Sequence, residues 1–244
     1  MSAQLTTAPG GDTDGVFARW WQLRGEWVEA PNRRRGGESG VQRLRDKADR
    51  LLYIKRQVGH LYRSWRRPLG RPTVLRELEA MQALEQLGIR VPRLVYAGAQ
   101  KRAGQWRALL VSEALHGFVS LEQWYADAAA SESALRQPML RQPMLRQPVL
   151  RQLALVLSRL HRAGWRHGCL YPKHIFIRPG TGAAGDGVEV ALLDLEKCRR
   201  YWSASTAARR DMAQLHRHRA GMPDADWRRL VDYYQLFTEY PDET

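Results

Sequence analysis

The sequence predicts an α+β fold in which the strands come first and the helices second. In the first half, short apolar runs alternate with turns rich in Gly and Pro, which is typical of β-strands. In the second half, apolar residues recur at helical spacing over longer stretches, and one hairpin of apolar strands interrupts them. The 244 residues are enough for one domain, or for a small lobe joined to a larger one.

The first part of the chain is predicted to form a sheet with one helix. Residues 1–15 are expected to be disordered, and an aromatic segment and a turn rich in Gly and Arg follow. The stretch "DRLLYIKRQ" predicts a short strand that ends near Lys55. Turns marked by Pro then lead to a helix over 73–87, with Thr73 as its N-cap and Gly88 as its stop. Two further strands, "VPRLVYAG" and "WRALLVSEAL", complete this part.

Lys55 and Glu77 form the first candidate pair for chemistry. Lys55 ends a strand of apolar residues, where a charged group needs a partner. Glu77 has Met81 and Leu84 one and two helical turns later, so it borders the buried side of its helix, whereas Glu79 faces outward. Glu77 is therefore a suitable partner for Lys55.

The second part begins with a helix at "SLEQWY", for which Ser120 and Gln123 form a capping box. Residues 135–154 then repeat as LRQPM, LRQPM, LRQPV and LRQLA. Because a Pro every five residues forbids a continuous helix, we interpret residues 135–149 as a tandem insertion at a surface loop. Where the prolines stop, the apolar spacing predicts a helix over 149–163.

A tight loop between this helix and the next strand gathers reactive side chains. It reads "WRHGCLYPKHIFI", residues 165–177, and carries two His, a thiol, a Tyr and a Lys. The strands "HIFI" and "VEVALLDL" are predicted to pair as a hairpin. His174 begins the first strand and Asp194 ends the second, so we expect the two side chains to lie close together. A carboxylate at this place could bind a hard cation. Two helices separated by a Gly/Pro break complete the chain.

The charge of the chain indicates an anionic partner. The net charge is +14 and the isoelectric point is near 10.4. Five of the 39 basic residues are Lys and the other 34 are Arg, a bias that suits planar, bidentate contacts with phosphate or carboxylate. The candidate partners are a nucleotide, a nucleic acid, an anionic lipid or a phosphorylated glycan. The alternative is a basic surface that serves solubility alone.

Neither the cysteines nor the N-terminal residues indicate export. Cys169 and Cys198 form no CxxC pattern and no disulfide framework. The opening "MSAQLTTAPGGDTDG" has no apolar core and no basic start, unlike a signal peptide. No run approaches the roughly 18 apolar residues that span a bilayer. We therefore expect a cytoplasmic protein without a transmembrane segment, with attachment to a membrane surface left open.

The order of the candidate residues matches that of a phosphoryl-transfer site. A Gly-rich turn before the Lys55 strand could approach phosphates through backbone N–H groups. The pair of Lys55 and Glu77 follows, then the helix, loop and strand, and then Asp194. This is the order of parts in enzymes that transfer a phosphoryl group.

With these residues in place, the chain resembles the protein-kinase-like superfamily, and over nearly its whole length it is most similar to the lipopolysaccharide kinases of the InaA and Kdo/WaaP group. The segments that carry the resemblance are "GEWVEAPNRRRGGESGVQRL", "LYIKRQ", "GRPTVLRELEAM", "HGCLYPKHIFI", "LLDLEK" and "RRDMAQLHRHR". The resemblance implies a two-lobe fold, with a small β-rich N-lobe over 16–115 that includes an αC-like helix. A mainly helical C-lobe over 116–244 would carry the catalytic-loop hairpin.

The resemblance also implies a role in ATP binding for several residues. Gly37 and Gly40 would belong to the loop that covers the phosphates. Lys55 would hold the α- and β-phosphates and pair with Glu77. Glu113 and its neighbours in "VSEALHG" would form the hinge that reads adenine through backbone hydrogen bonds.

In the second lobe, the resemblance implies three further roles. His167 would hold the catalytic loop in shape, as the His of the kinase H-R-D motif does. Asp194 would bind Mg²⁺, as the Asp of the D-F-G motif does. Asp211, in "RRD", would brace the catalytic loop from the following helix.

The catalytic loop departs from the kinase pattern at two positions. Cys169 stands where the pattern has the catalytic Asp, and His174 stands where it has the second metal-binding Asn. A thiol with a pKa near 8.5 is mostly protonated at neutral pH, and imidazole is a poor ligand for Mg²⁺. Because a general base contributes roughly 10²–10⁴-fold, its loss need not abolish transfer, and Lys173 could steady the γ-phosphate. Cys169 could also be an inert buried thiol.

Three functions are compatible with these observations. The first is an ATP-dependent, Mg²⁺-dependent kinase of a heptose or Kdo sugar in the lipopolysaccharide inner core, acting at the cytoplasmic face of the inner membrane. The second is a pseudokinase that binds nucleotide or acts as a scaffold in a stress response, which the substitutions at Cys169 and His174 favour. The third is a nucleic-acid-binding protein, which only the charge supports, because no helix-turn-helix, zinc-finger or RNP motif is present.

Overall fold

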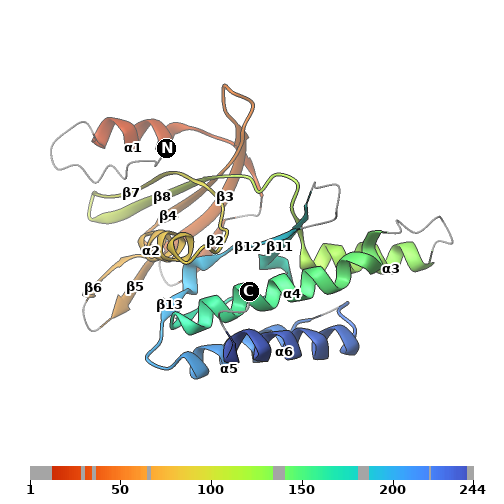
Figure 1. Cartoon of the computed structure of the whole chain (residues 1–244). Helices are drawn as coiled ribbons and strands as arrows, with labels where there is room; N and C mark the ends of the chain where they lie inside the picture. Colours follow the sequence, from red (N-terminus) through yellow and green to blue (C-terminus); the bar gives the residue numbers. More distant parts are fainter. Residues whose placement is uncertain are drawn as a thin grey trace. The chain divides into compact units, whose positions relative to one another are not determined.

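The structure is a computed structural model of the chain, and it describes residues 13–28, 31–34, 37–64, 67–133, 141–180, 187–219 and 221–240. By their contacts the residues divide into two compact units, Met1–Leu75 with Arg93–Ala114 and Arg76–Pro92 with Leu115–Thr244. An antiparallel sheet dominates the first unit and helices dominate the second, which confirms the predicted α+β class (Figure 1). Residues 76–92, expected in the N-lobe, group with the second unit.

The first unit is built on a six-stranded sheet with the order β1-β3-β4-β8-β7, in which β2 also pairs with β3. Its strands are β1 (Glu26–Trp27), β2 (Asn32–Arg34), β3 (Gly37–Arg45), β4 (Leu51–Val58), β7 (Leu94–Arg102) and β8 (Gln105–Glu113). A separate hairpin joins β5 (Leu61–Ser64) to β6 (Arg67–Pro72). The pairs β3–β4 and β7–β8 are consecutive in the chain, whereas the pair β4–β8 joins distant segments.

An N-terminal helix, α1 (Thr13–Gln22), packs against this sheet (Figure 1). Phe17 is buried with apolar residues of β4 and β8, and its ring stacks on Trp21 with 5.6 Å between the centroids. The helix starts inside the segment that was predicted to be disordered, because burial of its aromatic side chains stabilises it against the sheet. The rest of that segment, residues 1–12, lies outside the described residues.

Strand β4 carries Lys55 at the centre of the sheet. It pairs with β3 on one side and with β8 on the other. The strand does not end near Lys55, as predicted, but continues to Val58. The polar Arg56 fits inside the strand because its guanidinium donates a hydrogen bond to the carbonyl oxygen of Trp21 at 2.7 Å.

The side chain of Gln57 caps the start of α2 (Thr73–Gln86). Its Oε1 accepts hydrogen bonds from the Thr73 hydroxyl at 2.9 Å and from the Val74 N–H at 3.1 Å. The expected N-cap role of Thr73 is therefore wrong, since Thr73 donates and Gln57 supplies the acceptor that the first turn of a helix needs. Gln57 and Lys55 are two residues apart on β4, so their side chains share one face of the sheet.

The rest of α2 agrees with its predicted pattern. Glu77 is buried, with 7% of its surface exposed, and Glu79 is exposed. The helix stops before Gly88, whose φ of +69° is a backbone conformation that glycine adopts without strain.

The second unit is built around the long helix α4. Its helices are α3 (Leu121–Ser133), α4 (Arg141–Arg162), α5 (Ala204–Arg217) and α6 (Asp224–Glu239). Helix α4 packs against both α5 and α6 (Figure 1). The predicted apolar stripe of α4 is buried, and its fully buried members are Leu150, Leu153, Leu157 and Leu160. These residues form the centre of the apolar core of this unit.

Helix α4 begins eight residues earlier than predicted, inside the LRQPM repeat. It contains Pro148 in its interior and Pro143 in its first turn. The first N–H groups of a helix have no partner within it, so Pro143 costs no hydrogen bond. Pro148 does cost one, and burial of the following Val149 and Leu150 offsets that loss. The surface-loop interpretation is thus wrong for residues 141–149, and residues 134–140 lie outside the described residues.

Two small antiparallel sheets hold the loops of the second unit. One has the order β12-β11-β9, and the other pairs β10 with β13. Their strands are β9 (Val119–Ser120), β10 (Trp165–Arg166), β11 (Ile175–Pro179), β12 (Val188–Leu192) and β13 (Arg199–Arg200). The strands β11 and β12 form the predicted hairpin, which starts with Ile175 opposite Leu192. One half of the predicted capping box of α3 is present, since the Ser120 hydroxyl accepts from the Gln123 N–H at 3.1 Å, whereas the Gln123 side chain donates to Asp127 Oδ1 at 2.6 Å.

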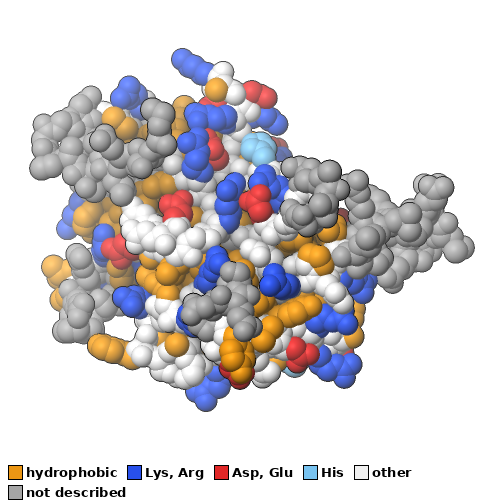
Figure 2. Space-filling model, viewed as in Figure 1, with side chains coloured by type: hydrophobic (Ala, Val, Ile, Leu, Met, Phe, Trp, Pro, Cys, Tyr) orange, Lys and Arg blue, Asp and Glu red, His pale blue; other side chains and the backbone are white. Residues whose placement is uncertain are grey.

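The surface reflects the basic composition of the chain. Figure 2 shows Lys and Arg side chains spread over the face in view, with acidic side chains between them. No helix within the described ranges has the length and apolar character needed to cross a bilayer.

Candidate active site

Helix α5 braces the loop that follows β10. Asp211 Oδ2 accepts the N–H of His167 at 2.6 Å, and Oδ1 accepts the N–H of Gly168 at 3.0 Å. One turn later on the same helix, Gln214 Oε1 accepts the N–H of Leu170 at 3.2 Å. The bracing role predicted for Asp211 is confirmed, and Gln214 extends it.

The Asp211 carboxylate is fully buried but well compensated. His161 Nε2 lies 3.3 Å from its Oδ2, and Arg166 Nε lies 3.4 Å from its Oδ1. Burial alone would raise the pKa of Asp211, but the hydrogen bond and charge of His161 and the N–H of Gly168 outweigh it and lower the pKa. Asp211 is therefore a fixed negative charge behind the loop.

His167 is a neutral structural residue of the loop. It is fully buried, and burial lowers its pKa to about 4. Its Nδ1 accepts the N–H of Cys169 at 3.2 Å, so the proton of the neutral ring is on Nε2. That atom makes no hydrogen bond of ordinary geometry within the described residues, although the nearby backbone of Leu193 favours the charged form weakly.

The thiol of Cys169 is held between two charged side chains. Cys169 is buried, with 4% of its surface exposed. Burial and the neighbouring Asp194 carboxylate raise its pKa to about 11, against the opposing effect of the Lys197 ammonium. The charges of both side chains act on the thiol, so both lie near the sulfur. The thiol is therefore protonated at neutral pH.

Gly168 lets the loop approach the backbone of Lys197. Its φ is +79°, and an added Cβ would lie 2.9 Å from the Lys197 carbonyl oxygen. Glycine is therefore required here both for the backbone conformation and for the space. This close approach brings Lys197, in the short 3-10 turn Leu195–Lys197, next to Cys169.

His174 and Asp194 lie close together, as the hairpin predicted. His174 Nδ1 is 3.6 Å from Asp194 Oδ2 and 2.8 Å from the carbonyl oxygen of Cys169. A carbonyl oxygen only accepts, so Nδ1 carries a proton and cannot be a metal ligand. The Nδ1–H of His174 therefore donates to the loop carbonyl, and the Asp194 carboxylate lies beside the ring without a hydrogen bond to it.

Asp194 has an unusual backbone conformation after β12. Its φ of 58° and ψ of 60° lie in the left-handed region, which Asp tolerates better than most residues. The turn that follows leaves the side chain one-third exposed, at 34%. Its carboxylate is therefore accessible and lies 3.6 Å from His174 Nδ1.

These residues fit one Mg²⁺ ion. In proteins, Mg²⁺ is usually bound by one or two carboxylates together with substrate phosphates and water, and Asp194 supplies one carboxylate. Among the described residues, no group of three or more His, Cys, Asp and Glu side chains could hold a metal ion by itself. A direct metal contact by His174, which was predicted, would require its Nε2.

Two lysines, Lys173 and Lys197, flank this site, and the sequence predicted a role for Lys173. Lys173 lies exposed in the 3-10 turn Pro172–His174, which leads into β11. Lys197 was given no role, yet it reaches the Cys169 thiol. The rarity of Lys in this chain, and its place three residues after Asp194, were the signals that could have identified it.

In the first unit, Gly37 and Gly40 are closely approached by the protein itself. Both lie on β3. An added Cβ on Gly37 would lie 2.7 Å from the Gly59 backbone, and one on Gly40 would lie 2.6 Å from the Trp27 ring. Packing within the unit therefore explains both glycines, and their contact with phosphates stays a prediction.

Lys55 and Glu77 remain a predicted pair. Lys55 is half-buried on β4, on the sheet face from which Gln57 caps α2. Glu77 is one turn into that helix and is buried. The two residues belong to different units, so their pairing stays a prediction.

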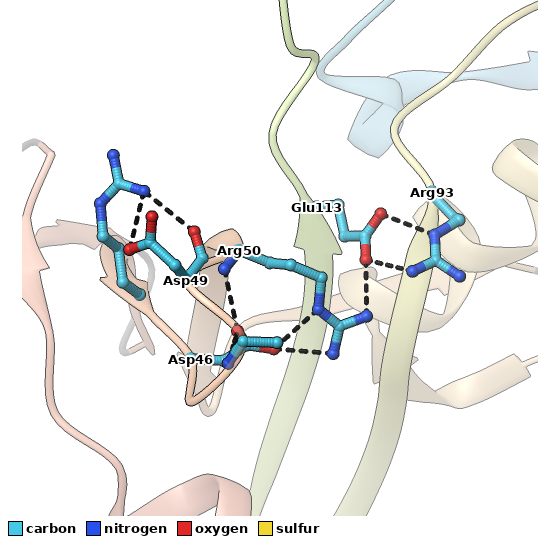
Figure 3. Close-up of polar contacts among 7 residues, drawn as sticks. Asp46, Asp49, Arg50, Arg93 and Glu113 are labelled. Atoms are coloured by element: carbon cyan, nitrogen blue, oxygen red, sulfur yellow. Dashed lines mark hydrogen bonds and ion pairs between the residues drawn. The ribbon is translucent and has the colours of Figure 1, made fainter.

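Glu113 is held by two arginines at the end of β8 (Figure 3). Its carboxylate contacts Arg93 and lies 3.0 Å from Arg50 NH1, and Arg50 is also paired with Asp46 at 2.7 Å. Hydrogen bonds and charges of the arginines lower the pKa of Glu113 against the effect of burial. Its N–H already donates to the Arg93 carbonyl at 2.9 Å. If this segment binds adenine, the hydrogen bonds would therefore come from the Glu113 carbonyl oxygen or from the residues that follow.

The antiparallel sheet, the braced loop and the hairpin-end aspartate together define a protein-kinase-like protein. The model of the lipopolysaccharide kinase (Kdo/WaaP) family matches residues 18–234. The chain therefore belongs to the lipopolysaccharide kinase (Kdo/WaaP) family.

Two similar proteins support this membership. Protein InaA of Escherichia coli (strain K12) is 39% identical over 220 residues, which cover 89% of this chain and 94% of that protein. The solved structure "WaaP in complex with acyl carrier protein" has a TM-score of 0.65 at 20% identity, covering 91% of this chain and 82% of that one. The first supports the family, and the second supports the kinase-like fold.

Proposed function

We propose that the protein is an ATP-dependent phosphotransferase that acts on a heptose or Kdo sugar of the lipopolysaccharide inner core. The observation that carries this proposal is the position of Asp194. Its accessible carboxylate lies at the end of a hairpin beside His174, next to a loop that Asp211 braces. Family membership supports lipopolysaccharide as the substrate.

The residues of the chain would divide the work of binding ATP. Gly37 and Gly40 would cover the phosphates, and Lys55, paired with Glu77, would hold the α- and β-phosphates. Asp194 would hold Mg²⁺, which neutralises charge on the phosphates during transfer. The support is the matching order of these residues in the chain and the accessible carboxylate.

The chain would then position the acceptor hydroxyl for direct in-line attack on the γ-phosphate. Lys173 is proposed to steady that phosphate. Cys169 would contact the hydroxyl but would not accept its proton at neutral pH, because the thiol is itself protonated. The missing base would slow transfer by roughly 10²–10⁴-fold and leave the positioning of the reactants intact.

The acceptor is proposed to be presented at the cytoplasmic face of the inner membrane. Lipopolysaccharide is anionic, and an excess of Arg favours contact with anionic groups at a bilayer surface. The net charge of +14 supports this peripheral location.

A pseudokinase is the second candidate, and the state of Cys169 favours it. A buried thiol with a pKa of about 11 is protonated at neutral pH and is a poor general base. His174 stands where the kinase pattern has a metal-binding Asn, and its Nδ1–H donates to the Cys169 carbonyl oxygen. In this case the fold would bind nucleotide or serve as a scaffold without transferring phosphate.

A transfer assay separates the two candidates. The purified protein is incubated with γ-labelled ATP, Mg²⁺ and dephosphorylated core lipopolysaccharide. Asp194→Asn serves as the inactive variant, and Asp232→Asn, which changes an exposed carboxylate on α6, serves as the matched control. The kinase is supported if the wild type and Asp232→Asn label the lipopolysaccharide and Asp194→Asn does not. The pseudokinase is supported if the wild type shows neither transfer nor ATP hydrolysis above the level of Asp194→Asn.

A further inference from the structure

Three arginines converge on the hydroxyl oxygen of Tyr201. Arg199 NH2 donates to it at 2.8 Å, Arg166 NH1 at 2.9 Å and Arg210 NH1 at 3.3 Å. The same three guanidinium groups lie over the Tyr201 ring, between 5.2 and 5.7 Å from its centroid. They come from three elements, since Arg166 is on β10, Arg199 is on β13 and Arg210 is on α5. We name these four residues the Tyr201 cluster.

The Tyr201 cluster has more hydrogen-bond donors than Tyr201 can satisfy. A phenol oxygen has two lone pairs and carries a proton of its own, whereas three N–H groups point at it. Each guanidinium carries five N–H donors, and one from each is directed at the phenol. The remaining donors are suited to a second acceptor with several oxygens.

The positive charge of the Tyr201 cluster is poorly neutralised. Arg166 lies 3.4 Å from the Asp211 carboxylate, but no carboxylate among the described residues pairs with Arg199 or Arg210. Arg166 and Arg199 also lie directly opposite each other on paired strands, where like charges are destabilising. An arrangement that gathers like charges in this way favours an anion between them.

The phenol itself responds to this charge. Burial alone would raise the pKa of Tyr201, but hydrogen bonds and charges from Arg199 and Arg166 outweigh it and lower the pKa to about 8. The same field that stabilises a phenolate would stabilise any other anion bound beside it.

The Tyr201 cluster is both fixed and accessible. The backbone N–H of Tyr201 donates to the Gly164 carbonyl at 2.7 Å, which ties the residue to the end of α4. Arg199 and Arg210 are exposed and Tyr201 is half-buried. The guanidinium groups are therefore held in place on a surface that a ligand can reach.

We propose that Arg166, Arg199 and Arg210, arranged around Tyr201, form a binding site for a phosphate monoester. Guanidinium groups bind phosphate oxygens through paired, parallel hydrogen bonds. Three guanidinium groups that approach from three directions suit the several oxygens of a phosphate monoester better than the two oxygens of a carboxylate. The phosphate could be carried by a soluble sugar phosphate or by a lipid headgroup. This site does not depend on the proposed kinase activity.

The site also touches the candidate active site. Arg166 immediately precedes His167, and its guanidinium lies beside the Asp211 carboxylate that accepts the His167 N–H. A phosphate bound at Arg166 would therefore be separated only by the Arg166 side chain from Asp211, which braces the loop. Binding there would favour an ordered loop without any contact with ATP.

The test uses the Tyr201 phenol as a reporter. Ultraviolet absorbance of tyrosinate is titrated from pH 6 to 11 in the wild type and in Tyr201→Phe, and their difference gives the midpoint of Tyr201. Inorganic phosphate is added against sodium chloride at matched ionic strength. A bound phosphate opposes the phenolate charge, so we expect the midpoint to rise by about one pH unit.

Matched variants give the test its specificity. Arg199→Gln with Arg210→Gln should abolish the response to phosphate, whereas Arg209→Gln, an exposed neighbour on α5, should keep it. Vesicles of phosphatidic acid and of phosphatidylcholine distinguish the sources, since a response to phosphatidic acid alone assigns the site to a lipid-borne phosphate. A midpoint that neither phosphate nor phosphatidic acid moves beyond the chloride control would overturn the proposal and leave the Tyr201 cluster as a packing feature.

Discussion

The thiol of Cys169 lies beside the carboxylate of Asp194, at the position where a kinase has its catalytic base. Burial and this carboxylate raise the pKa of the thiol to about 11. The thiol can therefore donate a hydrogen bond to Asp194, but it cannot accept a proton from a sugar hydroxyl at neutral pH. The proposed active site would therefore position its reactants without a general base at Cys169.

The contact of Gly168 with Lys197 is predicted to stabilise the loop. Gly168→Ala should lower the free energy of unfolding by about 2–5 kcal/mol, the sum of the costs of a left-handed backbone and of an overpacked Cβ. Gly104→Ala is the matched control, because Gly104 has nearly the same φ, +78°, and no atom within 4 Å of an added Cβ. Gly104→Ala should lower the free energy of unfolding by only about 1–2 kcal/mol. Equal losses in urea unfolding would argue against a close approach of the loop to Lys197.

The buried His167 is predicted to make the protein less stable in mild acid. Its pKa is about 4 in the folded protein and about 6.5 when unfolded. Between these values the unfolded state binds the extra proton, so stability falls as the pH falls. From pH 7.5 to 5.5 the loss due to His167 is about 1.4 kcal/mol.

The neutral variant His167→Asn isolates this effect. The variant is expected to be less stable at both pH values, but it should lose about 1.4 kcal/mol less than the wild type between them. Urea unfolding at pH 7.5 and 5.5 gives both differences. The same acid loss in both proteins would contradict a neutral, buried His167.

The two prolines of α4 are predicted to differ in their effect on stability. Pro148 lies inside the helix, so Pro148→Ala should restore a hydrogen bond and raise the free energy of unfolding by about 1–3 kcal/mol. Pro143 is in the first turn, where an N–H has no partner in the helix, so Pro143→Ala should change it by less than about 0.5 kcal/mol. A thermal melt of both variants measures the difference. If Pro148→Ala brought no gain, the start of α4 at Arg141 would be in doubt.

The elements that carry the site followed from local patterns in the sequence. Alternating apolar residues predicted the β11–β12 hairpin, and its geometry brought His174 and Asp194 together. The bracing role of Asp211 came instead from the resemblance to kinases, and Asp211 accepts two N–H groups of the loop from α5. The hairpin prediction succeeded because it depends on the apolar pattern of two short segments and on pairing between neighbours in the chain.

Other features depend on contacts that no local pattern contains. The cap of α2 comes from Gln57 on a strand, and the early start of α4 depends on burial that outweighs Pro148. Lys197 reaches Cys169 because Asp194 takes a left-handed conformation and Gly168 admits a close approach. The Tyr201 cluster needs three elements at once, and each of its arginines looks like an ordinary surface residue in the sequence.

We propose that this loop is a phosphotransfer site without a general base at Cys169, and Cys169→Asp tests this proposal most directly. The new carboxylate would have the Lys197 ammonium as a partner and could accept the proton of the sugar hydroxyl. We predict that transfer of γ-phosphate to core lipopolysaccharide rises at least tenfold, toward the roughly 10²–10⁴-fold that a general base contributes. Cys169→Ser, which is similar in size and has no carboxylate, should stay at the wild-type rate. Equal rates for Cys169→Asp, Cys169→Ser and the wild type would contradict the account.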